Sequence, residues 1–185
     1  DENLSPMVSL VKEGDERYYQ LRRYAETKEC IAQEIGNRME GIGFDDEFDW
    51  ASLVNQAIEN ETDESTWDEQ ERMARAEKAV ALRMICQSRV SVLMGAAGTG
   101  KSTLIKALCD IPKVQHGGVL LLAPTGKARV RLEQASGMAG KGKTIAQFLN
   151  GLQRYDGEIG RYFMNPSAPR AAGQRTVVID DCSLL

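Results

Sequence analysis

Gly95-Ala96-Ala97-Gly98-Thr99-Gly100-Lys101-Ser102 decides the fold, because this stretch has the form G-x-x-x-x-G-K-[ST] of a phosphate-binding loop. The apolar run 90–94 precedes it and the helix-favouring run 103–109 follows it, so the pattern lies between an expected strand and an expected helix. Glycines allow positive φ and close approach, so that backbone N–H groups and the N-terminus of the helix face an anion. The stretch therefore predicts a site for a nucleoside triphosphate.

Each residue type in this loop has a chemical reason to be there. We expect Lys101 to bring a positive charge to the β and γ phosphates, and the Ser102 hydroxyl to be a hard ligand for Mg²⁺. The expected cofactors are therefore ATP and Mg²⁺. The residues expected to bind the nucleotide are Gly95, Gly98, Thr99, Gly100, Lys101, Ser102 and Thr103.

A second element has the form of a Walker B strand. At residues 176–181 the apolar run Thr-Val-Val-Ile ends in two carboxylates. Asp180, at the carboxyl end of this expected strand, can join Ser102 in the Mg²⁺ shell, while Asp181 can orient or deprotonate water. We therefore expect Asp180 and Ser102 as metal ligands, and Lys101 and Asp181 as catalytic residues.

Short apolar runs separated by Gly and Pro follow residue 89. The runs 90–94, 119–123 and 176–179 are typical of buried strands, and helical segments follow the first two. This alternation predicts an α/β fold with a parallel sheet and flanking helices. The stretches 136–142 and 156–174 are rich in Gly, Pro, Ser and basic residues, so we expect loops or a mobile insertion there.

The first part of the chain is acidic and is expected to be helical throughout. Apolar positions recur at helical spacing over 14–39, 50–58 and 66–87. Residues 1–77 carry 8 Lys and Arg against 21 Asp and Glu, net −13, whereas the remainder carries 15 against 6, net +9. The basic part suits polyanionic ligands, although the two parts can also neutralise each other across an internal interface.

The composition indicates the class of protein and its cellular compartment. No apolar stretch approaches the ~20 residues of a membrane span, and the acidic N-terminus has no signal pattern. The four cysteines are scattered without a C-x-x-C pair, and His116 has no neighbours at metal-ligand spacing. We therefore expect a cytoplasmic protein with free thiols and no membrane partner.

The residues between the two motifs resemble those of a particular family. Ala123-Pro124-Thr125-Gly126-Lys127-Ala128-Arg129 is similar to motif Ia, with the sequence APTGKA, of RecD-like superfamily 1 DNA helicases. Residues 144–149, Thr-Ile-Ala-Gln-Phe-Leu, resemble motif Ib, and residues 179–184 resemble motif II, usually IDExSM. With the phosphate loop, four motifs fall in the family's order over residues 90–185, about half of the chain.

The resemblance implies a first RecA-like motor lobe that binds ATP and grips single-stranded DNA. It implies a P-loop NTPase lobe at 66–185, truncated after Walker B. The acidic segment at 1–65, expected to be all-α from its own apolar spacing, would be an accessory segment. The full-length parent would be an ATP-dependent DNA helicase or translocase with a second RecA-like lobe, and the chain alone would bind ATP with little hydrolysis. The nucleic-acid contacts that the resemblance implies are Thr125, Gly126, Lys127 and Thr144.

Three positions depart from the family's pattern. Asp181 stands where motif II has Glu, which withdraws the carboxylate by about 1.5 Å. Ala146 stands where many relatives have His, and Glu77-Lys78 lies near the spacing at which such helicases place an adenine-reading Gln. Two other functions stay open: a non-hydrolysing nucleotide-dependent switch or interaction module, and a small-molecule P-loop kinase whose basic lid would be Arg154, Arg161, Arg170 and Arg175.

Overall fold

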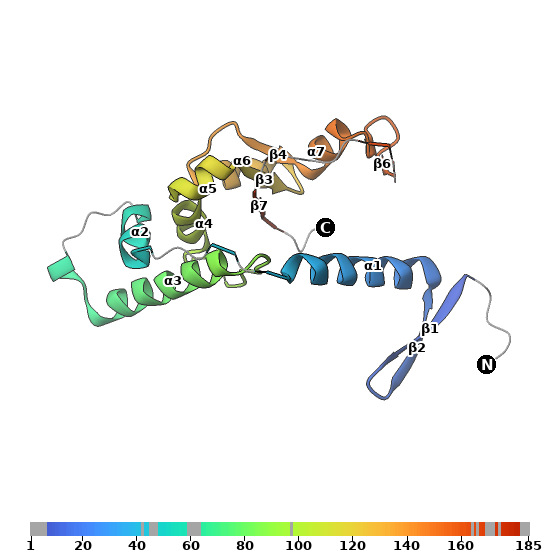
Figure 1. Ribbon diagram of the computed structural model, residues 1–185, viewed down its shortest axis with the longest axis horizontal. Coiled ribbons are helices and arrows are strands. Elements are labelled where there is room, and N and C mark those ends of the chain that lie inside the picture. The colour runs from blue at the N-terminus through green and yellow to red at the C-terminus, as the bar shows by residue number, and fades with distance from the viewer. Residues whose placement is uncertain are drawn as a thin grey trace. The chain divides into compact units, whose positions relative to one another are not determined.

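The structure of the chain, a computed structural model, has two compact units (Figure 1). One unit comprises Asp1–Asp46 and Ile85–Val92, and the other comprises Glu47–Met84 and Leu93–Leu185. This division by contacts differs from the predicted boundary after residue 65, which stays a prediction. The structure describes residues 7–41, 43–44, 48–58, 64–96, 98–163, 165, 167–168, 173 and 175–181.

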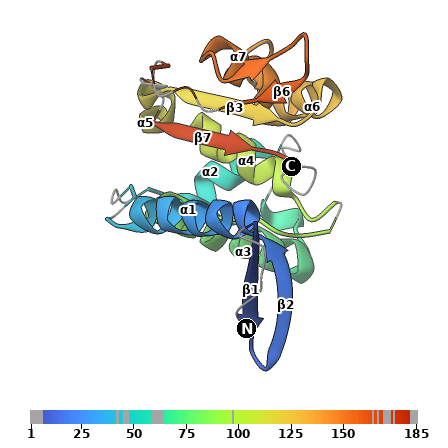
Figure 2. The ribbon, with the colours of Figure 1, turned by 90° about the vertical axis from the view of Figure 1, so that its right-hand side faces the viewer.

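A parallel sheet of three strands is the centre of the second unit. Its strands are β3 (Val119–Ala123), β4 (Gly142–Thr144) and β7 (Thr176–Ile179), in the spatial order β4-β3-β7. Figure 2 shows β3 and β7 running in the same direction, and their register pairs Leu122 with Ile179. The predicted α/β class with a parallel sheet is confirmed, and β3 and β7 have the predicted bounds.

The helices α4 (Lys101–Asp110) and α6 (Gly126–Ser136) pack against this sheet. Cys109, Leu121 and Leu132 form a buried cluster, and partly buried Ile105 and Val178 pack on it. Removing an aliphatic side chain of this size from water stabilises the fold by roughly 1.5–3 kcal/mol. The shorter helices of this region are α5 (Pro112–Gly117) and α7 (Ile145–Gly151).

A buried carboxylate ties α6 to β4. The side chain of Glu133, which is 8% exposed, accepts a hydrogen bond from the Gly142 N–H at 2.9 Å. Its Oε1 also lies 3.9 Å from Arg129 Nε. A methyl group added at Gly142 would lie 2.9 Å from the Glu133 side chain, so the close approach of helix and strand requires glycine there. This contact fixes the start of the strand that ends at Thr144.

Two helices from the acidic part of the chain belong to the same unit as the sheet. The helix α2 (Trp50–Ala57) begins after Asp49, whose carboxylate accepts from the Ser52 N–H at 3.0 Å, and it packs on α4. A 3₁₀ turn (Glu64–Thr66) leads to α3 (Glu69–Gln87), whose final residues, 85–87, fall in the other unit. Both helices are predicted correctly in type.

The first unit begins with a β-hairpin, so the all-α description of the N-terminal segment is wrong. The strands β1 (Val8–Glu13) and β2 (Glu16–Leu21) pair antiparallel, with Glu13 opposite Glu16. Gly14 joins them at a φ of 61°, which a tight two-residue turn requires. Apolar residues spaced three apart fit a helix locally, but cross-strand pairing decides the structure of residues 16–21.

The helix α1 (Arg22–Met39) follows the hairpin directly, and none of its residues is buried. Its apolar positions lie on the surface, with Ile31 54% and Met39 59% exposed. Within the described residues, no helix combines the length and the apolar composition that crossing a membrane requires.

The strand predicted at 90–94 is not formed. Residues 91–96 have no regular secondary structure, and Val92 and Met94 are 81% and 85% exposed. A strand exists only where a neighbour completes its hydrogen-bond ladder, and none of the strands in the described part of the chain pairs with this run. The stretch predicted as a loop at 156–174 holds part of a small hairpin, formed by β5 (Tyr155–Asp156) and β6 (Arg161–Tyr162).

Candidate functional site

The phosphate loop has the backbone that its glycines predict. Gly98 and Gly100 have φ values of 82° and 86°, in the region that favours glycine. The Thr99 hydroxyl donates a hydrogen bond to the Ala96 carbonyl oxygen at 2.9 Å, and a methyl group added at Gly95 would lie 2.7 Å from that hydroxyl. The loop is therefore folded closely on itself; Ala97 lies outside the described residues.

The helix α4 begins at Lys101, directly after the loop, and no side chain caps its N-terminus. The N–H groups of the first turn of a helix have no partner within that helix, and the helix dipole favours negative charge there. Ser102 and Thr103, the second and third residues of α4, therefore stand at a position that attracts an anion. The structure places all seven expected nucleotide-binding residues on the loop or on this first turn.

The Lys101 ammonium group lies over the loop. Its Nζ donates hydrogen bonds to the carbonyl oxygens of Gly95 and Ala96, both at 2.7 Å. Lys101 thereby joins the first residues of the loop to the helix that follows it. A positive charge held at this point suits the phosphate tail of a nucleotide.

The two predicted carboxylates follow β7. The Asp180 N–H donates to the Leu122 carbonyl oxygen at 3.0 Å, which extends the pairing with β3 by one residue. Asp181 is exposed and has a φ of 51°, in the left-handed region that Asp tolerates better than most residues. The motif II residues Cys182, Ser183 and Leu184 lie outside the described residues.

The residues present fit Mg²⁺ held together with a nucleotide. Among the described residues, no group of three or more His, Cys, Asp or Glu side chains could hold a metal ion. Mg²⁺ is usually bound by one or two carboxylates together with substrate phosphates, and it prefers oxygen ligands. The Ser102 hydroxyl and the Asp180 carboxylate are oxygen donors of this kind.

Thr125 and Thr144 both cap helices. The Thr125 hydroxyl accepts from the Ala128 N–H at 3.2 Å and begins α6, and the Thr144 hydroxyl accepts from the Gln147 N–H at 3.1 Å and begins α7. Gln147 completes a capping box by accepting from the Thr144 N–H at 2.9 Å. A hydroxyl has one donor and two acceptor positions, so each O–H remains able to donate to a phosphate oxygen.

The sheet register brings these threonines and Asp180 to one edge. Thr144 pairs with Ala123 at the end of β3, two residues before Thr125, and Asp180 bonds to Leu122 of the same strand. Gly126 and Lys127, the first residues of α6, are exposed beside this edge. Within the described part of the chain, no hydrogen bond or ion pair joins the loop to Asp180 or Asp181.

A cavity that the sequence does not reveal lies beside the loop. Its volume is about 430 Å³, and it opens between α3 and the phosphate loop. In the sequence, only the position of Lys78 points to this cavity, because Lys78 lies about as far before the phosphate loop as the family's adenine-reading Gln does. The residues that line the cavity include Ile58, Glu71, Ala74, Lys78, Gly100 and Thr103.

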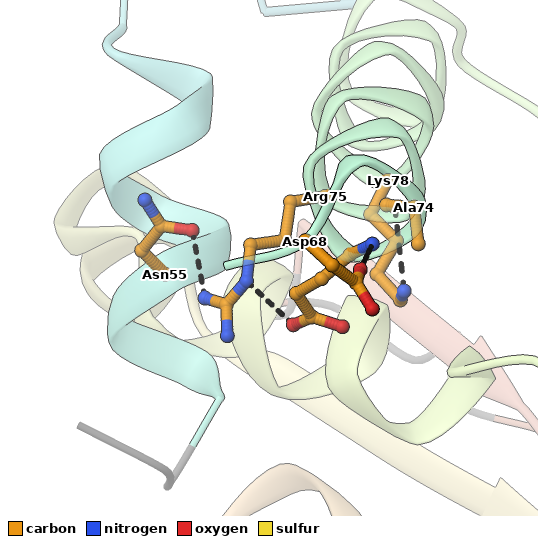
Figure 3. A network of polar contacts seen from close by, with 6 residues as sticks. Asn55, Asp68, Ala74, Arg75 and Lys78 are labelled. Atoms are coloured by element: carbon orange, nitrogen blue, oxygen red, sulfur yellow. Dashed lines mark hydrogen bonds and ion pairs between the residues drawn. The ribbon is translucent and has the colours of Figure 1, made fainter. Parts of the chain in front are cut away.

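A buried arginine holds the helical wall of this cavity together (Figure 3). Arg75, which is 7% exposed, donates to the Glu71 carboxylate at 2.7 Å and to the Asn55 side-chain oxygen at 3.0 Å. Its guanidinium carbon also lies 4.0 Å from the ring centroid of Trp67. Asn55 belongs to α2, so the network joins α2 to α3.

The free thiols predicted from the sequence are confirmed for the described cysteines. Cys30 is exposed, whereas Cys86 and Cys109 are buried and unbridged. Burial raises the pKa of Cys86 to about 11. Burial, and secondly the negative charge of Asp110, raise the pKa of Cys109 to about 11. Both buried thiols are therefore protonated at neutral pH, so they are poor nucleophiles and poor metal ligands.

Known proteins match the part of the chain that contains the phosphate loop. A family model described as an AAA domain matches residues 73–185. A segment of 61 residues is 44% identical to the ATP-dependent RecD2 DNA helicase of Deinococcus radiodurans, covering 33% of this chain and 8% of that protein. A segment of 67 residues is 33% identical to an uncharacterised protein of Methanocaldococcus jannaschii, covering 35% of this chain and 6% of that protein. The chain thus spans less than a tenth of either relative, and its resemblance to RecD-like helicases is confirmed.

Proposed function

The chain belongs to the AAA domain family of P-loop ATPases, and on that premise we propose that it is the ATP-binding part of a DNA helicase or translocase. In this proposal, hydrolysis of ATP drives movement along single-stranded DNA. The observation that carries it is the shared edge of the sheet, where Thr125 follows β3, Thr144 ends β4 and Asp180 follows β7. In open α/β sheets, ligands bind at the carboxyl ends of the strands. The metal of the nucleotide and a nucleic-acid backbone would therefore bind at neighbouring positions on this edge.

In the proposed nucleotide site, residues of the loop and the two carboxylates after β7 have separate roles. Backbone N–H groups from Gly98 to Thr103 hold phosphate oxygens, and Lys101 offsets their charge. Ser102 and Asp180 would hold Mg²⁺, which would supply positive charge against the charge that develops on the phosphates. Asp181 orients water and accepts its proton, from a backbone that is already in the left-handed region.

The nucleic-acid part of the proposal assigns roles to the helix starts at the same edge. The O–H groups of Thr125 and Thr144 donate to successive backbone phosphates, while their acceptor positions keep the helices capped. The Gly126 N–H adds a donor at the start of α6. The exposed ammonium group of Lys127 adds an attraction that does not depend on DNA sequence and that weakens with salt.

The test is the substitution Thr125→Asp. Asp is as good a helix cap as Thr, so α6 stays capped, but its carboxylate repels a DNA phosphate. We expect the affinity for a fluorescent oligo(dT), measured by anisotropy, to fall at least about tenfold. The matched control is Thr125→Asn, which also caps the helix without adding a charge and should stay within about threefold of the wild type.

Two results would overturn the DNA assignment. One is a Thr125→Asp variant that binds oligo(dT) as tightly as the Asn variant. The other is a wild-type chain that binds ATP but shows no affinity for oligo(dT) at low salt, where phosphate contacts are strongest. In either case the kinase and the switch would become the better descriptions of the site.

A further inference from the structure

Lys78, on α3, lies directly against the phosphate loop. A methyl group added at Gly100 would lie 2.5 Å from Lys78 Cε and 3.5 Å from Lys78 Nζ. Glycine is required at position 100 by its φ of 86°, and the end of the Lys78 side chain fills the space beside it. The α3 ammonium group thus stands beside the residue that caps α4.

Among the described residues, Lys78 forms no ion pair with a carboxylate. Its Nζ donates to the Ala74 carbonyl oxygen at 3.3 Å, a long hydrogen bond within its own helix. Within the described part of the chain, no Asp or Glu lies within ion-pair distance of this ammonium group. Two acidic residues of α3, Glu71 and Glu77, line the same cavity, and Glu71 is already bound by Arg75 at 2.7 Å. Lys78 therefore has a half-buried charge available to an anionic ligand.

The helix that carries Lys78 is tied to its neighbours by hydrogen bonds and packing. Arg75, one turn before it on α3, donates hydrogen bonds to Glu71 and Asn55 (Figure 3). Its guanidinium group also lies over the Trp67 ring. Because Asn55 lies on α2 and α2 packs on α4, the loop and α3 are linked through packed helices. Lys78 is thus presented from a helix that is bonded to α2.

We propose that Lys78 is a second phosphate-binding cation of this site, which contacts the phosphate chain of the nucleotide from the cavity side of the loop. The inference rests on the proposed nucleotide binding. Lys101 serves the loop from the first turn of α4, whereas Lys78 serves it from α3, so the two ammonium groups face the phosphates from different elements. The alternative for this position is a contact with the base, as in a base-reading glutamine.

The test compares Lys78→Met with the wild type. Methionine keeps an unbranched apolar stem against Gly100 and removes only the charge. A charge-assisted hydrogen bond of this kind corresponds to roughly a tenfold to hundredfold change in affinity. We expect that loss for both ATP and GTP, measured by calorimetry, because the two nucleotides share the phosphate chain. Lys78→Arg should stay within about threefold of the wild type, since it restores the charge.

The matched control is Arg83→Met, which removes an exposed charge from the same helix and should bind ATP as the wild type does. Thermal unfolding of each variant should coincide with the wild type, which separates binding from folding. Lys78→Gln gives an uncharged polar side chain and should lose affinity as Lys78→Met does.

Three results would overturn the inference. The first is an unchanged affinity of Lys78→Met for ATP and GTP. The second is a loss confined to one of the two nucleotides, which would assign Lys78 to the base. The third is Lys78→Gln binding ATP as tightly as the wild type. If instead the wild-type chain and Lys101→Ala bind ATP equally, or neither binds, the proposed function itself fails and the inference fails with it.

Discussion

The Lys101 ammonium group donates a hydrogen bond to the Gly95 carbonyl oxygen at 2.7 Å, so the cation that we propose to bind the phosphates also closes the loop. We expect Lys101→Ala to lower ATP affinity at least about a hundredfold, because both the charge and the loop closure are lost. Calorimetric titration with ATP measures the affinity. The bonds lost are on the exposed loop, so the midpoint of urea unfolding should change little.

The control for this substitution is Lys106→Ala on the same helix. Lys106 forms a surface ion pair with Asp110 at 3.0 Å, which is worth at most about 1 kcal/mol. Its loss should leave ATP affinity unchanged. Equal ATP affinities for Lys101→Ala and Lys106→Ala would show that the loop is not a phosphate site.

Asp180→Asn should weaken the effect of Mg²⁺ on ATP binding by roughly tenfold, because a neutral amide is a poorer ligand for Mg²⁺ than a carboxylate. The backbone bond from Asp180 to Leu122 does not involve the side chain and is retained. Titrations with ATP in Mg²⁺ and in EDTA measure the effect. Asp15→Asn, in the turn of the β1–β2 hairpin, is the control. The assignment of Asp180 fails if both variants respond to Mg²⁺ alike.

Arg75→Ala should lower the free energy of unfolding by about 2–3 kcal/mol, since it removes a buried charged hydrogen-bond donor and its contact with Trp67. Glu71 is partly exposed and keeps its hydration, which limits the loss. Urea denaturation followed by tryptophan fluorescence is the measurement. The control is the exposed Arg72→Ala, for which we expect a change within about 0.5 kcal/mol. Similar losses for both would mean that the network contributes no stability.

The parts of the fold that can be predicted from the sequence are those whose signal is local and contiguous. The bounds of β3 and β7 follow from short apolar runs with turn residues on both sides. The helix after the motif is predicted over 103–109, and α4 contains this run within Lys101–Asp110. Positive φ at Gly98 and Gly100 follows from the need for close approach. In each case the residues that form the signal are also the residues that form the structure.

The parts that could not be predicted depend on partners far away in the sequence. The run 90–94 has the composition of a strand, but no described strand pairs with it. The apolar spacing after Gly14 fits a helix, but β1 pairs with residues 16–21 instead. Lys78 shows no motif of its own, because its role depends on how α3 packs beside Gly100. Pairing and packing of this kind are tertiary properties that a local pattern does not contain.

The buried thiol of Cys109 gives a prediction for pH dependence. Its pKa is raised from the ordinary value of 9.0 to about 11, chiefly by burial, so the folded protein holds this proton more tightly than the unfolded chain does. Below pH 9 both states are protonated and the stability is complete. As the pH rises from 9 toward 11, the unfolded chain loses the proton first and the free energy of unfolding falls, by up to about 1 kcal/mol per pH unit.

Cys109→Ala should therefore show a shallower fall than the wild type in urea denaturation between pH 9 and 10.5. The exposed Cys30→Ala is the control and should follow the wild type. The packing lost in Cys109→Ala lowers its curve equally at every pH, so two parallel curves would contradict the raised pKa.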